Sequence, residues 1–157
     1  MVKINFSNRQ RKTPVSNDMR GLIEQAVNAS LIVENIIADA EVNVTLVSDR
    51  RIKQINREFR NINNSTDVLS FPLCDGDDFD INPENNCCML GDIVISIDHV
   101  IAQAEFFGHG LERELAYLTV HSMFHLLGYD HIDEGEEKKL MRSREEKALK
   151  LIGLEIK

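Results

Sequence analysis

One stretch of this chain, residues 111–131, constrains its fold more than any other. The first part of the stretch is apolar, with the spacing of a largely buried helix. It carries His121 and His125, which are four residues apart and therefore project from one face of that helix. Gly128 follows where a helix can end in a left-handed residue, so the chain can turn back and bring His131 toward the other two. The stretch therefore predicts three imidazoles that converge at the end of a buried helix.

Three imidazole ligands with one open position are the usual layout of a catalytic zinc site, and a buried helix is a rigid mount for them. We therefore expect one Zn²⁺ per chain, bound by His121, His125 and His131. Nickel or copper would bind the same ligands at least as tightly. A structural metal is the alternative, but structural zinc usually has four protein ligands, often with cysteine among them. No cysteine is close in sequence to these histidines.

The spacing H-x-x-x-H-x-x-G-x-x-H also overlaps the pattern of the metzincin peptidases. In that pattern a glutamate follows the first histidine and acts as the general base. Ser122 stands at this position, and a serine hydroxyl cannot take up a proton at neutral pH. The metallopeptidase hypothesis therefore lacks its key residue.

The histidine segment resembles the signature of the YbeY family of bacterial rRNA maturation factors, which is close to H-G-x-L-H-L-x-G-Y-D-H. Ser122 replaces the usual Gly of this signature and Phe124 replaces the usual Leu, but neither is a proposed ligand. The matching residues are His121, His125, Leu126, Gly128, Tyr129, Asp130 and His131.

Two further blocks are similar to the same family. Residues 56–72 resemble its N-x-x-Y/F-R and P-T-D-V-L-S-F-P segments, with Ser65 where the family usually has Pro. Residues 90–96 resemble its L-G-D-I-x-I-S strand. The blocks lie in the family's order and, with the flanking helices, the resemblance covers nearly the whole chain.

The resemblance implies a single-strand-specific, metal-dependent endoribonuclease that acts in late 3′-end maturation of small-subunit rRNA and in ribosome quality control. The partners that it implies are ribosomal RNA, the small ribosomal subunit and ribosome assembly factors. It also points to Arg60 as functionally important. The guanidinium of an arginine stays charged and presents a fork that fits phosphate, so we expect Arg60 to be catalytic. The structural alternative for Arg60 is a salt bridge at a helix end.

A second hypothesis is a non-catalytic ribosome assembly factor with a structural metal. The formal net charge of −8 argues against broad, nonspecific nucleic-acid binding. No general base is visible in the motif, and Asp130 is better suited to orient a histidine or to support the structure. The charge is uneven, however, and a local basic face can hold phosphates. The basic residues gather at Arg50, Arg51, Lys53, Arg57 and Arg60.

The pattern of the whole chain predicts an α+β fold in a single domain over residues 1–157, with one sheet of about four strands packed by about five helices. The metal site would lie on a buried helix and on the turn after it. Strand patterns fall at residues 2–6, 41–47, 67–71 and 89–97. Helical patterns fall at residues 17–33, 49–60, 98–107, 111–127 and 133–151, with Asp98 as one expected cap. The residues expected on the inner faces of the second and last helices are Ile52, Ile55, Asn56, Phe59, Leu140, Met141, Ala148 and Leu151.

The N-terminus has no signal-peptide pattern, and no apolar run approaches the ~20 residues of a membrane helix. The three cysteines lack the spacing of a disulfide framework, which is typical of a reducing compartment. We therefore expect a cytoplasmic protein that contacts neither membranes nor DNA.

Overall fold

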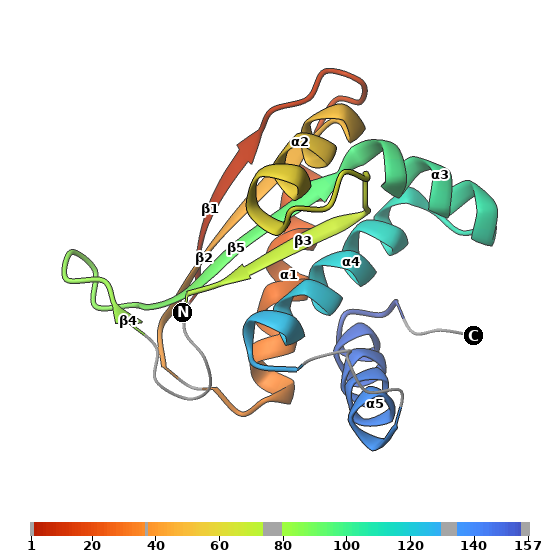
Figure 1. The fold of residues 1–157 in the computed structure, drawn as a ribbon. Coiled ribbons are helices and arrows are strands. Elements are labelled where there is room, and N and C mark those ends of the chain that lie inside the picture. The colour runs from red at the N-terminus through yellow and green to blue at the C-terminus, as the bar shows by residue number, and fades with distance from the viewer. Residues whose placement is uncertain (1, 37, 74–79, 130–134, 155–157) are drawn as a thin grey trace.

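This computed structural model describes residues 2–36, 38–73, 80–129 and 135–154. The strands are β1 (Val2–Asn8), β2 (Ala40–Val47), β3 (Val68–Pro72), β4 (Asp80–Ile81) and β5 (Cys88–Ser96). They form one sheet in the order β1-β2-β5-β3, and the short β4 also pairs with β5 (Figure 1). β1, β2 and β5 are parallel, whereas β3 and β4 are antiparallel to β5. The sheet is therefore mixed, with β3 as its antiparallel edge.

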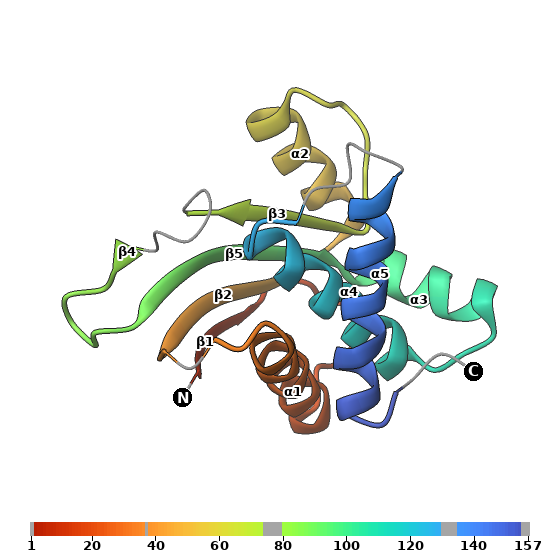
Figure 2. The ribbon, with the colours of Figure 1, turned by 90° about the horizontal axis from the view of Figure 1, so that it is seen from below.

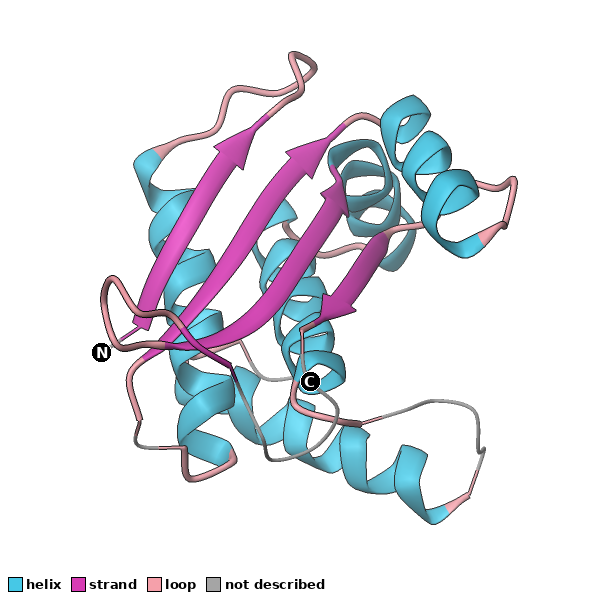
Figure 3. Ribbon diagram, turned by 60° about the vertical axis from the view of Figure 1, so that its left-hand side comes forward, coloured by secondary structure: helices cyan, strands magenta, loops and turns pink. Residues whose placement is uncertain are grey.

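Five helices accompany the sheet within those ranges (Figure 3). They are α1 (Asn17–Val33), α2 (Asp49–Arg60), α3 (Ile97–Phe107), α4 (Leu111–Leu126) and α5 (Glu136–Leu151). The predicted α+β fold, with one sheet and five helices, is confirmed, and β4 is added to the four expected strands. None of these described helices has both the length and the apolar character that crossing a bilayer requires.

The helices cover both faces of the sheet (Figure 2). α1 and α4 pack on one face, where Val44, Ile93 and Ile95 are fully buried. α2 packs on the other face, over a smaller cluster around Ile52 and Val94. α5 packs on α1 and α4 from the side away from the sheet. α4 is thus enclosed between the sheet and α5, which explains why buried residues lie on nearly every side of it.

The inner face of α5 is narrower than the sequence predicts. Met141, Ala148 and Leu149 are buried against α1 and α4, at the spacing of one thin stripe. Leu140 and Leu151 lie on the flanks of that stripe and are 47% and 57% exposed, so both predictions were wrong. The reason is that α5 packs on two helices along a line of contact and does not sink into a wider groove.

The start of α3 also differs from the prediction. Ser96, and not Asp98, caps the helix, because the Ser96 side chain accepts a hydrogen bond from the backbone N–H of His99. The Asp98 carboxylate instead accepts a hydrogen bond from the backbone N–H of Asp49 at 2.7 Å and pairs with the Lys12 ammonium at 2.6 Å. The Lys12 contact and then the Asp49 N–H lower the pKa of Asp98. Asp98 therefore ties the start of α3 to the start of α2.

Candidate metal centre

Two of the predicted ligands lie side by side at the C-terminal end of α4. The Nε2 atoms of His121 and His125 are 3.2 Å apart, as the four-residue spacing predicts. The Nδ1 atom of His121 lies 2.6 Å from Oε2 of Glu145, and the Nδ1 atom of His125 lies 2.8 Å from the carbonyl oxygen of Tyr129. Each ring is therefore held by one nitrogen while its other nitrogen faces the shared space.

These contacts indicate which nitrogen of each ring donates a hydrogen bond. A carbonyl or carboxylate oxygen only accepts hydrogen bonds, so the Nδ1 atom of each ring carries the proton and donates it. In the neutral form of each ring the lone pair is then on Nε2, and the two Nε2 atoms lie 3.2 Å apart, close enough to bind one cation together. Holding Nδ1 by a carboxylate or a backbone carbonyl is also how proteins orient histidines that bind metals. The pair therefore fits a metal centre.

Glu145 is the functional residue that sequence reasoning missed. It comes from α5, and its side chain is 8% exposed. A buried carboxylate is costly unless it is paired, and the His121 ring supplies that partner. The sequence did contain a signal, because Glu145 lies between Met141 and Ala148 on the stripe of α5 that faces inward. An acidic residue at such a position indicates a buried polar partner.

The third predicted ligand, His131, lies outside the described residues, as does Asp130. Among the residues that are described, no group of three or more His, Cys, Asp or Glu side chains lies close enough to hold a metal ion. The described chain thus supplies two of the three expected imidazoles. The three-histidine site stays a prediction.

Ser122 points away from the two histidines toward the sheet. It is fully buried in α4, and its hydroxyl shares a short hydrogen bond with the hydroxyl of Ser70 on β3. This position therefore supplies a contact between α4 and β3, and no general base.

Gly91 makes the close packing beside this contact possible. Its φ angle is +139°, which side chains rarely adopt, and it pairs with Pro72 on β3. A Cβ atom at this position would collide with the carbonyl oxygen of Phe71 and would lie 3.1 Å from the Leu126 side chain at the end of α4. The glycine of the L-G-D-I-x-I-S block thus lets β3, β5 and the helix that carries the histidines meet closely.

Arg60 ends α2 and reaches across to β3. Its Nη2 atom donates a hydrogen bond to the backbone oxygen of Ser70 at 2.6 Å, and its guanidinium lies 5.4 Å from the centre of the Phe71 ring. No carboxylate within the described ranges forms an ion pair with it, which disfavours the salt-bridge alternative. Ser70 therefore contacts Arg60 through its backbone oxygen, and through its hydroxyl it contacts Ser122, the residue that follows His121.

The rest of α2 presents an exposed basic surface. Ile52 and Asn56 are buried as predicted, whereas Phe59 is 70% exposed and packs edge-on against Phe71. The exposed basic residues of α2 are Arg50, Arg51, Lys53, Arg57 and Arg60.

Two carboxylates in the blocks that match the family form hydrogen bonds within the fold. Asp67 accepts one from the backbone N–H of Val68, and Asp92 accepts one from the Asn43 side chain.

Tyr117 lies one turn before His121 on α4, and its ring centre is 5.8 Å from that of His121. Burial raises the pKa of Tyr117 to about 12, and the charges of Glu145 and Glu114 contribute to the same shift. The phenol therefore stays neutral near neutral pH.

Comparison with known proteins places this chain in a family. The family model described as Endoribonuclease YbeY matches residues 5–153. A protein named Endoribonuclease YbeY from Caldanaerobacter subterraneus is 44% identical over 98% of this chain and 99% of its own length. One of the same name from Alkaliphilus metalliredigens is 42% identical over 98% of this chain and 97% of its own length.

A solved structure is also similar. The solution structure of a protein from Thermotoga maritima matches with a TM-score of 0.59 and 29% identity, over 97% of this chain and 91% of that one. The sequence resemblance is confirmed by the family model and by the curated relatives. This chain, with its paired histidines on an enclosed helix, belongs to the endoribonuclease YbeY family.

Proposed function

We propose that this protein is an endoribonuclease that cleaves single-stranded RNA and acts in the late 3′-end maturation of small-subunit ribosomal RNA and in ribosome quality control. The observation that carries the proposal is the oriented pair of His121 and His125 in a chain whose curated relatives are named endoribonucleases. The substrate is then ribosomal RNA, and the partners are the small ribosomal subunit and its assembly factors in the cytoplasm. The buried, hydrogen-bonded Ser122 gives no support to a peptidase.

The proposed metal ligands are His121, His125 and His131, and the proposed metal is zinc. When bound, zinc supplies a Lewis acid that polarises a phosphoryl oxygen and lowers the pKa of a water molecule to about 7. Glu145 and the carbonyl oxygen of Tyr129 hold the two described rings by Nδ1, so that their Nε2 atoms face the position of the proposed metal. These contacts also prevent the rings from rotating away when RNA enters.

Arg60 is the proposed phosphate-binding group. Its hydrogen bond to the Ser70 backbone uses one of its five N–H donors, so the remaining donors can bind the negative charge that develops on the phosphoryl group. The exposed basic residues of α2 continue from Arg60 along one helix and suit the backbone of a single strand. The local charge of this helix is thus opposite to that of the whole chain.

The test is cleavage of a labelled precursor fragment that covers the 3′ end of small-subunit rRNA. The purified protein is compared with a His125→Ala variant prepared in the same way. We expect that only the unmodified protein cuts the fragment. Equal cleavage by both proteins would assign the activity to a contaminant, and no cleavage by either would favour the non-catalytic assembly factor.

A further inference from the structure

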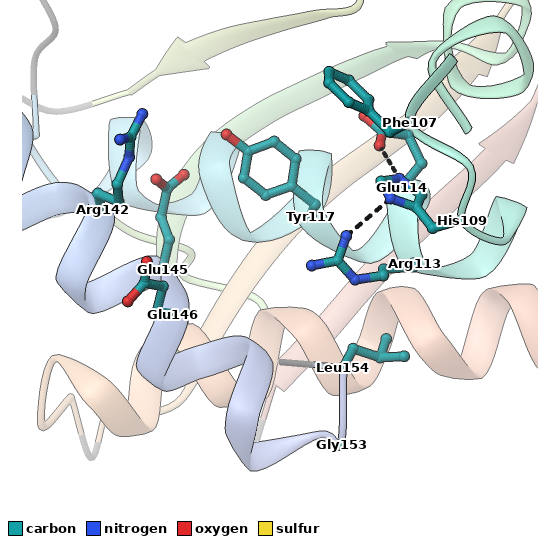
Figure 4. Close-up of a pocket in the computed structure, with 10 residues that line it drawn as sticks. All are labelled: Phe107, His109, Arg113, Glu114, Tyr117, Arg142, Glu145, Glu146, Gly153 and Leu154. Carbon is teal, nitrogen blue, oxygen red and sulfur yellow. Dashed lines mark hydrogen bonds and ion pairs between the residues drawn. The ribbon is translucent and has the colours of Figure 1, made fainter. Parts of the chain in front are cut away.

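A pocket of about 780 Å³ opens between α4 and α5 beside the histidine pair. Its volume lies within the range of pockets that bind small-molecule ligands. One wall comes from the end of α3 and the start of α4, and the opposite wall comes from α5 and the turn that follows it (Figure 4). Tyr117 lies between the two walls (Figure 4).

The pocket and the histidine pair lie along one row of α4. Arg113, Tyr117, His121 and His125 follow one another at four-residue intervals, so their side chains share one face of the helix. Glu145 belongs to both places, because it lines the pocket and also accepts the hydrogen bond from His121. Tyr117 and His121 are separated by about 6 Å along the helix axis, at 1.5 Å per residue. A ligand in the pocket would therefore be adjacent to anything held at the histidines.

An exposed aromatic ring forms one wall. Phe107 is 62% exposed, and its ring is stacked on the His109 ring at an interplanar angle of 15°. The His109 ring is itself fixed, because its Nδ1 atom accepts a hydrogen bond from Arg113 at 3.0 Å and its Nε2 atom donates one to Glu114 at 2.6 Å. Such a supported, open aromatic face is the kind of surface on which proteins stack unpaired nucleobases.

The pocket contains two cationic side chains that can bind an anionic part of a ligand. Arg113 and Arg142 contribute guanidinium groups from opposite walls (Figure 4). Three carboxylates also line it: Glu114 and Glu145 are buried and each is paired with a histidine ring, whereas Glu146 is exposed. An aromatic ring with Arg113 on its side of the pocket and Arg142 on the opposite wall matches a nucleotide, which combines a flat base with a phosphate.

We propose that this pocket is a nucleotide-binding subsite, in which Phe107 stacks on an unpaired base next to the cleaved bond while Arg113 and Arg142 bind its phosphates. The inference rests on the proposed function, because it assigns a part of the RNA substrate to a place beside the histidine pair. It gives a physical reason for preferring single strands, since a base inside a duplex cannot reach the ring.

The test uses fluorescence anisotropy with a short, single-stranded 2′-O-methyl oligonucleotide of the precursor sequence, which keeps the bases and phosphates of the RNA. Phe107→Ala and Arg142→Gln should each weaken its binding about tenfold, in line with the loss of one stacked base or one phosphate contact. Ile32→Ala and Lys147→Gln are the controls, because Ile32 is an exposed apolar residue on α1 and neither side chain lines the pocket. The amount of bound metal and the thermal stability should be the same in the unmodified protein and in the four variants.

The outcomes separate this inference from the nuclease proposal. If Phe107→Ala binds the oligonucleotide as tightly as Ile32→Ala does, or if the unmodified protein does not bind it at all, the subsite is overturned, whether or not precursor RNA is cut. If binding falls only in the two pocket variants, the subsite holds, even for a protein that cuts no RNA. Loss of binding in all four variants would also contradict it, because the effect would not belong to the pocket.

Discussion

At the residue scale, the histidine pair depends on groups that are far from it in sequence. His121 is oriented by Glu145 on the next helix, and His125 by the backbone of the turn at Tyr129. The i, i+4 spacing predicts that the two rings share a face, but a spacing rule cannot tell which group will hold each ring. That information depends on how α5 packs on α4, which is a tertiary contact.

Replacing Glu145 with glutamine should weaken metal binding about 10–100-fold while the fold is retained. The amide keeps the shape of the side chain but loses the charge that supports the His121 ring. Competition with a chromophoric chelator measures the affinity, and Glu146→Gln is the control because it changes an exposed neighbour on the same helix. Unchanged affinity in Glu145→Gln would remove this carboxylate from the centre.

Arg60→Ala should keep the bound metal and the melting temperature but lower the rate of RNA cleavage by about 100-fold, the usual cost of one charge-stabilising donor. Arg60→Lys should recover only part of the rate, because an ammonium cannot present a planar fork to phosphate while it also contacts the Ser70 backbone. Single-turnover cleavage measures both variants. A rate equal to that of the unmodified protein in Arg60→Ala would exclude Arg60 from the reaction.

At the element scale, the sequence predicted most helices and strands because local signals agree with the final fold. Ser16 and Ser48 cap α1 and α2, and alternating apolar residues mark β1 and β2. The failures are places where a tertiary contact decides the outcome. Asp98 looks like a cap but is used to join α3 to α2, and Leu140 continues an apolar pattern that has no partner surface.

The packing of β3 against β5 provides a test at this scale. Gly91→Ala should lower the free energy of unfolding by about 2–4 kcal/mol, because the new methyl group meets the Phe71 backbone in a strained conformation. Gly21→Ala is the matched control: Gly21 is inside α1 with open space around it, so the same change should stabilise the protein by about 0.5–1 kcal/mol. Chemical denaturation measures both. Equal effects of the two substitutions would contradict the close approach.

At the scale of the whole molecule, the sheet order brings the site together. β5 lies between β2 and β3, which makes β3 the edge strand. Arg60 at the end of α2 contacts Ser70 on β3, and Ser122 on α4 contacts the same serine. The sequence indicated the three family-like blocks separately but not their contacts, because strand order is not encoded in local spacing. The Ser70–Ser122 hydrogen bond joins two of those blocks across 52 positions of the chain.

The alkaline stability of the molecule should depend on Tyr117. Its pKa is about 12 in the folded protein and 10.0 in its ordinary state, so the folded chain retains a proton that the unfolded chain releases. The contribution of this pKa difference to the free energy of unfolding is complete below about pH 10 and is lost as the pH rises toward 12. Unfolding free energies across that window should fall more steeply for the unmodified protein than for Tyr117→Phe. Parallel curves would contradict the raised pKa.

The most direct test of the metal centre is a zinc titration of chelator-stripped protein, in which bound metal and the rate of precursor RNA cleavage are measured on the same samples. We predict that stripped protein does not cut, that cleavage rises in proportion to bound zinc up to one equivalent, and that His125→Ala recovers neither metal nor activity. Full cleavage by protein that contains no metal would contradict the account.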